Sequence, residues 1–203
     1  MVPYETVRDT RAASLVTLDN MEKAELFLKD QYTIFFSHQW LAFSTPDPDK
    51  SQYDLMVNAT RKLAKKKKME LSKVYIWVDY IGIAQESKVI QKYAIQTLPA
   101  IASSLHSFVV VAPSTPHSDL KTNCDLDTYK RRGWCRAEVL SHVARRGTSE
   151  LYIATEKGEL RKVDGTRVGD NVTVGERTEG KSAVRVSIRE QNVDLKLVEE
   201  MSR

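Results

Sequence analysis

The chain has 203 residues, 41% of them hydrophobic, which suits one compact domain with some additional elements rather than two full domains. Its 31 basic and 27 acidic residues leave a formal net charge of +4, so bulk charge gives no indication of nucleic-acid binding. No segment approaches the ~20 apolar residues that span a bilayer, and the first twenty residues lack the apolar run of a signal peptide. Cys124 and Cys135 have no partner at the spacing of a zinc site. We therefore expect a soluble, cytoplasmic protein with reduced thiols, no metal and no membrane span.

The first half of the chain alternates apolar strands with amphipathic helices. Residues Tyr32–Ser37 (YTIFFS) are rich in aromatic and β-branched side chains, which favours a buried strand. A loop over His38–Asp49 follows, and Gln52–Lys68 has apolar side chains at helical spacing with four lysines at its end. Residues Val74–Tyr80 (VYIWVDY) predict a second strand that is covered on both faces. A loop over Ile81–Gln85 leads on from it.

The same alternation continues in the second half. The stretch Ala94–Ile101 is helical by pattern, with Pro99 predicting a kink or break. Residues Phe108–Ala112 (FVVVA) form a third strand, and a polar loop of roughly twenty residues follows. Residues Trp134–Arg146 predict a helix, and Leu151–Ala154 a fourth strand.

From Glu156 to Arg203 the pattern weakens. Short alternating pieces such as Val184–Ile188 predict hairpins, and a closing helix is expected near Val193–Met201. We divide the chain into a lead-in (1–30), an α/β domain (31–155) and a C-terminal extension that completes or packs on the domain (156–203).

Strands and helices in this order predict an α/β, flavodoxin-like three-layer fold with a central parallel sheet flanked by helices. In such sheets ligands bind outside the carboxyl ends of the strands. Here these are the loops that begin at Ser37, Asp79 and Pro113.

The strongest cluster of chemistry-bearing residues is Arg131–Glu138 (RRGWCRAE), because its spacing places Trp134 and Glu138 one helical turn apart on one side. On a helical wheel both point away from Leu140 and Val143, so we expect Glu138 at the edge of the core rather than inside it. That position suits the wall of a cleft, and it equally suits an ordinary exposed glutamate near a helix N-terminus. Gly-rich phosphate-binding motifs are absent, which argues against a kinase, an NTPase or a dehydrogenase.

Two further groups follow the first two strands. Ser37, His38, Gln39 and Trp40 are placed to contact a ligand or, equally, to satisfy loop backbone groups and cover the edge of the core. Asp79, Tyr80 and Gly82 end the second strand, where an acidic residue often serves only to cap the following loop.

Four of these segments together resemble the TIR superfamily over roughly Tyr32–Ala154. They are FFSHQW, WVDYIGIAQ, LPAIASSLHSFVVVAP and GWCRAEVLS, in that order. The first two are similar to the TIR-like branch that includes heterokaryon-incompatibility domains. The W-C-x-x-E segment of plant TIR domains stands here as Trp134, Cys135 and Glu138.

The resemblance implies that Glu138 is a catalytic glutamate that cleaves NAD(P)+ as a substrate, with no separate cofactor. The products would be nicotinamide and ADP-ribose, or a cyclic form, in an immune or cell-death type of signalling. A carboxylate beside the ribose stabilises the positive charge of an oxocarbenium-like transition state. The residues expected to border the substrate are Ser37, His38, Gln39, Trp40, Asp79, Tyr80, Gly82, Trp134, Cys135 and Arg136. Of these, Trp134 or Trp40 would stack on a ring, and Arg136 would reach the diphosphate or pair with Asp79.

The resemblance also implies a homo-oligomer, because such enzymes commonly complete their site across subunits. Two alternatives remain open. One is a non-enzymatic signalling module that binds like domains or partners through the Ile81–Gln85 loop. The other is a receptor that binds a nucleotide without cleaving it.

Overall fold

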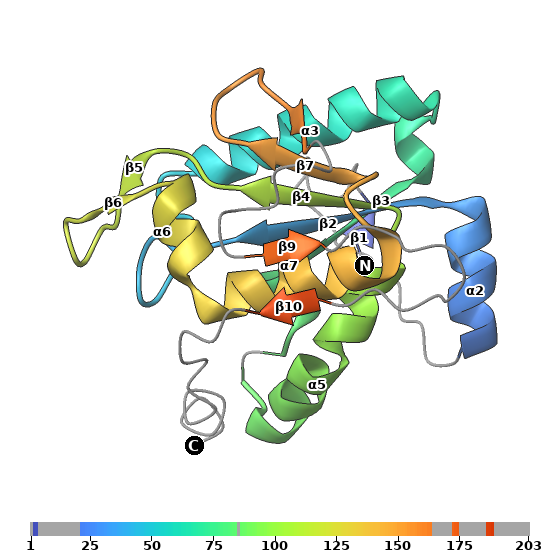
Figure 1. The fold of residues 1–203 in the computed structure, drawn as a ribbon, viewed down its shortest axis with the longest axis horizontal. Coiled ribbons are helices and arrows are strands. Elements are labelled where there is room, and N and C mark those ends of the chain that lie inside the picture. Colours follow the sequence, from blue (N-terminus) through green and yellow to red (C-terminus); the bar gives the residue numbers. More distant parts are fainter. Residues whose placement is uncertain (1, 4–20, 85, 164–171, 175–185, 189–203) are drawn as a thin grey trace.

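The computed structural model describes residues 2–3, 21–84, 86–163, 172–174 and 186–188, and its centre is a six-stranded sheet in the order β1-β3-β2-β4-β7-β8 (Figure 1). The four inner strands are parallel: β2 (Tyr32–His38), β3 (Val74–Val78), β4 (Ser107–Val111) and β7 (Leu151–Ala154). At the edges, β1 (Val2–Pro3) and β8 (Arg161–Lys162) pair antiparallel with their neighbours. The predicted parallel core of the sheet is confirmed, with two antiparallel edges added.

Helices cover both faces of the sheet, as Figure 1 shows. One face packs on α3 (Ser51–Lys67), and its core joins Ile34 and Phe36 of β2 to Leu55 and Leu63 of the helix. The other face packs on α5 (Lys88–Ser104) and α7 (Gly133–Arg146), where Phe35 lies with Leu98 and Val143. Successive residues of β2 therefore serve opposite cores. The flavodoxin-like three-layer fold expected from the sequence is confirmed.

Helix α5 continues through Pro99, so the break that the sequence allowed at this residue does not occur. A proline inside a helix removes one backbone hydrogen bond. Its neighbours Leu98 and Ala102 are 3% and 0% exposed, so burial of this side of the helix compensates for the missing bond.

Two predicted loops contain structure of their own. Strand β3 ends at Val78, and the short helix α4 (Asp79–Gly82) begins where the end of a strand and a loop were expected. The polar segment before Gly133 contains the small antiparallel pair β5 (Thr115–Pro116) and β6 (Asn123–Cys124), and then helix α6 (Leu126–Arg131). The capping box of Asp125 and Thr128 starts α6, because each side chain bonds the backbone N–H of the other residue.

The remaining described elements lie before, beside and after the sheet. Helix α2 (Met21–Asp30) falls in the lead-in, and a short 3-10 turn, η1 (Leu71–Lys73), precedes β3. Strands β9 (Val172–Val174) and β10 (Val186–Ile188) pair antiparallel, in agreement with the hairpins expected in the C-terminal extension. The closing helix predicted near Val193–Met201 lies outside the described residues. Within the described part of the chain, every helix is too short or too polar to cross a membrane.

Candidate functional site

The carboxyl end of β2 lies at the point where the strand order reverses. The chain continues from β2 to β3 on one side of it and reaches β4 on the other. Open α/β sheets commonly bind ligands at such a switch point. Helix α6 stands beside these strand ends (Figure 1).

Two neighbouring residues at the end of β2 point to opposite faces of the sheet. The Ser37 side chain bonds Tyr129 of α6 and Glu138 of α7. The His38 side chain bonds Gln52 of α3 and Asp79 of α4. The polar residues expected to form one cleft therefore form two separate clusters, one on each side of β2.

The first cluster is built around the carboxyl group of Glu138. Its Oε2 hydrogen-bonds the Ser37 hydroxyl, which lies 2.6 Å from the hydroxyl of Tyr129. Trp134, one turn earlier on α7, lies near enough to Glu138 to lower its pKa, so the two side chains share one site. Ser37, Tyr129 and Glu138 are 1%, 3% and 3% exposed, so the cluster is closed to solvent.

The prediction that Glu138 lies at the edge of the core is wrong. The buried stripe of α7 consists of Cys135, Glu138, His142 and Val143, whereas Leu140 is only half-buried. A wheel centred on apolar residues missed this stripe because two of its members are polar. Helix α6 closes over Glu138 through Tyr129 and was not predicted.

Burial raises the pKa of Glu138 to about 8, and the charge of Asp79 acts in the same direction. Hydrogen bonds from Ser37 and Trp134 and the charge of His38 lower it by less. The carboxyl group is therefore largely protonated at pH 7. It becomes a carboxylate when the pH rises or when a positive charge is placed next to it.

The second cluster holds His38 between two acceptors. Its Nε2 lies 2.8 Å from Oδ1 of Asp79, and its Nδ1 lies 2.5 Å from Oε1 of Gln52. The orientation of the Gln52 amide is fixed because its Nε2 donates to the carbonyl of Gln39 at 2.8 Å. Both ring nitrogens of His38 therefore face oxygens that accept, an arrangement that favours a proton on each nitrogen.

The pKa values of this pair agree with the geometry. Burial lowers the pKa of His38. The hydrogen bond and charge of Asp79 and the hydrogen bond of Gln52 raise it by more, so the pKa of His38 lies above its usual value. Burial raises the pKa of Asp79, and the bonds from His38 and Trp40 outweigh this effect and leave it below the usual value. The site thus holds a buried ion pair next to a neutral carboxyl group.

The other predicted residues after β2 mainly hold these loops in place. Trp40 donates its indole N–H to Oδ2 of Asp79 at 2.9 Å, and its ring meets the edge of the Tyr80 ring. Gln39 is buried and donates to the Asp125 carbonyl and to Thr128, both at 3.0 Å, at the start of α6. Tyr80 is 47% exposed and remains the most accessible ring of the group.

Three predicted residues have other environments than expected. Gly82 lies where the Trp77 indole comes so close that a Cβ would be 2.5 Å from its Nε1, so the residue serves close packing. Cys135 is buried, its thiol faces the His38 carbonyl at 3.7 Å, and burial raises its pKa. Arg136 is exposed on α7, and the pairing predicted between it and Asp79 is replaced by the ion pair with His38.

Sequence reasoning missed two residues of the site. Gln52 is 0% exposed and was assigned only to a helix start, because a single glutamine carries no positional signal. Tyr129 was predicted to lie in a loop, although the spacing of Asp125 and Thr128 matches a capping box and indicates the start of a helix.

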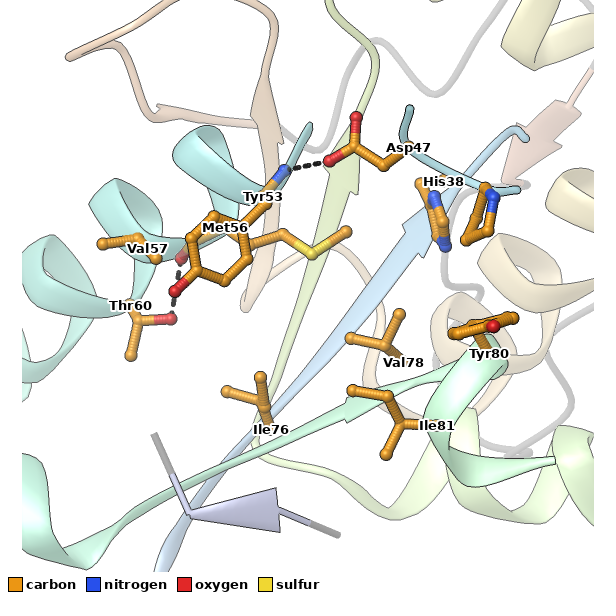
Figure 2. Close-up of a pocket in the computed structure, with 11 residues that line it drawn as sticks. His38, Asp47, Tyr53, Met56, Val57, Thr60, Ile76, Val78, Tyr80 and Ile81 are labelled. Carbon is orange, nitrogen blue, oxygen red and sulfur yellow. Dashed lines mark hydrogen bonds between the residues drawn. The ribbon is translucent and has the colours of Figure 1, made fainter. Parts of the chain in front are cut away.

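A pocket adjoins the second cluster and has His38 and Tyr80 in its wall, whereas Glu138 belongs to the other face of the sheet (Figure 2). Among the described residues, no three His, Cys, Asp or Glu side chains gather so that they could hold a metal ion. Comparison of the chain with protein-family models, curated proteins and solved structures found no match.

Proposed function

We propose that this chain is a TIR-like NAD(P)+ glycohydrolase that releases nicotinamide and ADP-ribose, or a cyclic product, with Glu138 as its essential carboxyl group. One observation carries the proposal. The Glu138 carboxyl group is held at the switch point of the sheet by Ser37, in a water-poor environment, and not on an open helix surface. Because Tyr129 of α6 covers this carboxyl group, α6 has to move aside when the substrate binds.

The environment of Glu138 suits a substrate that carries a positive charge. The nicotinamide ring of NAD(P)+ is cationic, and cleavage moves positive charge onto the ribose. A cation beside Glu138 favours the ionised form of a group whose pKa is about 8. The buried carboxylate then interacts with the developing charge more strongly than an exposed one would.

The hydroxyl of Ser37 would act as a positioning group. It bonds both Glu138 and Tyr129 and so fixes the direction of the carboxyl group. Removing one of several hydrogen bonds to a buried acid shifts its pKa and its orientation without removing the acid. We therefore assign Glu138 the chemical role and Ser37 the orienting role.

The test is nicotinamide release by the concentrated protein, with products separated by chromatography. Glu138→Gln keeps the shape of the side chain, and Glu159→Gln changes an exposed glutamate as the matched control. We expect turnover in the wild type and the control, a loss of at least about 100-fold in Glu138→Gln, and a wild-type rate that rises with pH up to about 8. Turnover that survives Glu138→Gln would refute the assignment.

A second function is favoured by exposed apolar side chains on α4 and the start of α5. Tyr80, Ile81, Val89, Ile90 and Tyr93 are between 40% and 66% exposed. Exposed apolar clusters often mark interaction sites, which suits a module that self-associates or binds partners. Absence of turnover, together with a mass above the monomer in light scattering that Ile90→Ser reduces, would favour this module. NAD(P)+ binding without cleavage would favour a receptor.

A further inference from the structure

A pocket opens at the carboxyl ends of β2 and β3, on the face of the sheet that α3 covers (Figure 2). Side chains from α3 form one wall, those from α4 form the opposite wall, and Ile76 and Val78 of β3 form the floor. The lining residues are His38, Pro46, Asp47, Tyr53, Met56, Val57, Thr60, Ile76, Val78, Tyr80 and Ile81.

The wall is made mainly of carbon, and its polar side chains Asp47, Thr60 and His38 already have partners. Asp47 accepts from the backbone N–H groups of Gln52 and Tyr53, at 3.2 and 2.7 Å. Thr60 donates to the Met56 carbonyl at 2.8 Å, and both ring nitrogens of His38 are used by the second cluster. A charged ligand would lose its hydration here without gaining a new partner, so the pocket selects against it.

The size of the pocket sets the size of its ligand. Its volume is about 130 Å³. A dry protein cavity of about 150 Å³ accepts benzene, so a single ring matches this space, and a second fused ring would extend into the open mouth. The rings of Tyr53, Tyr80 and His38 in the wall favour an aromatic ligand over an aliphatic one.

The pocket is reachable from solvent. Tyr80 and Ile81 both line it and are 47% and 40% exposed, so α4 forms its mouth. It also lies at the strand ends where doubly wound sheets commonly bind small molecules. Binding at this place would touch α4 and the His38 ring without occupying the cluster around Glu138.

We propose that this pocket binds a small, uncharged aromatic molecule of one or two rings. The site is separate from Glu138 and does not depend on the proposed NAD(P)+ chemistry. Its test therefore uses no turnover measurement.

The test is a titration of methyl-labelled protein with indole, followed by NMR signals of Met56, Ile76, Val78 and Ile81. We expect saturable shifts at these methyl groups. Indole-3-acetate and tryptamine, which carry a charge, should bind at least about tenfold more weakly.

Variants locate the site. Val57 is half-buried in the wall, and Val57→Phe should fill the pocket and weaken indole at least about tenfold, with the fold checked by circular dichroism. Ile81→Ala, at the exposed mouth, provides a second variant that does not disturb the core. The control Leu26→Phe changes an exposed residue of α2 that is not in the wall.

The proposal would be overturned if the methyl signals shifted without saturation up to the solubility limit of indole. That result would favour an apolar side chain of a protein partner as the occupant of the pocket. Equal affinity in Val57→Phe and wild type would also overturn it. A preference for tryptamine or indole-3-acetate would reject an uncharged ligand.

Discussion

At the scale of single residues, the protonation of His38 decides how the second cluster is built. A neutral ring would leave one of its nitrogens facing an oxygen with no proton between them, at 2.5 or 2.8 Å. Such a contact is unfavourable for two acceptors in a buried place. The imidazolium removes the conflict and needs Asp79 as its counter-ion.

We therefore predict that both ring nitrogens of His38 are protonated at pH 7 and that its pKa lies above the usual value of 6.5. Replacement of Asp79 by Asn should lower this pKa, because the charge that holds the second proton is gone. Nitrogen NMR of the imidazole signals measures both quantities. His106, whose pKa burial lowers, serves as a reference that should not change. An unprotonated ring nitrogen in the wild type at pH 7 would disprove the imidazolium.

The sequence identified part of this site for a physical reason. Polar residues directly after an apolar strand stand out, so Ser37, His38 and Asp79 were found. The sequence did not show how these side chains group, because the register of β2 decides on which side of the sheet each one lies. The predicted exposure of Glu138 was also wrong. Tyr129 covers its carboxyl group, and Tyr129 belongs to α6, a segment that was predicted as a loop.

At the scale of elements, α3 is fastened at both ends. At the C-terminus of α3, Lys67 forms an ion pair with Glu150 at 2.7 Å, and Lys66 donates to the Tyr152 hydroxyl at 3.1 Å. Two of the four consecutive lysines thus hold the helix against the β7 region, and they are not a free basic patch.

At the start of α3, the carboxylate of Asp47, which lies before the helix, accepts hydrogen bonds from the backbone N–H groups of Gln52 and Tyr53. We predict that Asp47→Ala lowers the free energy of unfolding by about 1 kcal/mol, as the loss of a helix cap usually does. The control Asp54→Ala removes an exposed acid of the same first turn and should cost only a few tenths. Urea unfolding measures both, and equal losses in the two variants would argue against the cap.

The strands and long helices were predictable because their apolar periodicity is strong, and β2, β4, α3, α7 and β7 begin and end within a few residues of the expected bounds. The short elements α4 and α6 were not predictable from periodicity, although the capping box of Asp125 and Thr128 is a local signal for the start of α6. Four or six residues are too few for a periodic pattern, and these helices depend on hydrogen bonds to neighbouring loops.

At the scale of the whole molecule, the buried Glu138 links stability to pH. A carboxyl group with a pKa of about 8 in the folded state and near 4.5 when unfolded binds more protons in the folded state between these values. Its contribution is fully present below about pH 4.5 and is lost as the pH rises through about 8.

We predict that the free energy of unfolding of the wild type falls by a few kcal/mol more than that of Glu138→Gln between pH 5 and about 8.5. His38 also contributes stability that is lost as the pH rises above its usual pKa of 6.5. Both proteins contain His38, so the comparison with the variant removes this contribution. Urea unfolding at several pH values measures it, with Glu159→Gln as the exposed control. Parallel curves for wild type and Glu138→Gln would show that the carboxyl group titrates normally.

The two antiparallel edges of the sheet affect how copies of the protein meet. An exposed parallel edge would offer a row of free backbone groups to any extended chain and invite aggregation. Here β1 ends at Pro3, which has no N–H to donate, and β8 consists of the exposed cations Arg161 and Lys162. Short, proline-bearing or charged edges discourage strand addition, so the two borders protect the sheet from fibril-like growth.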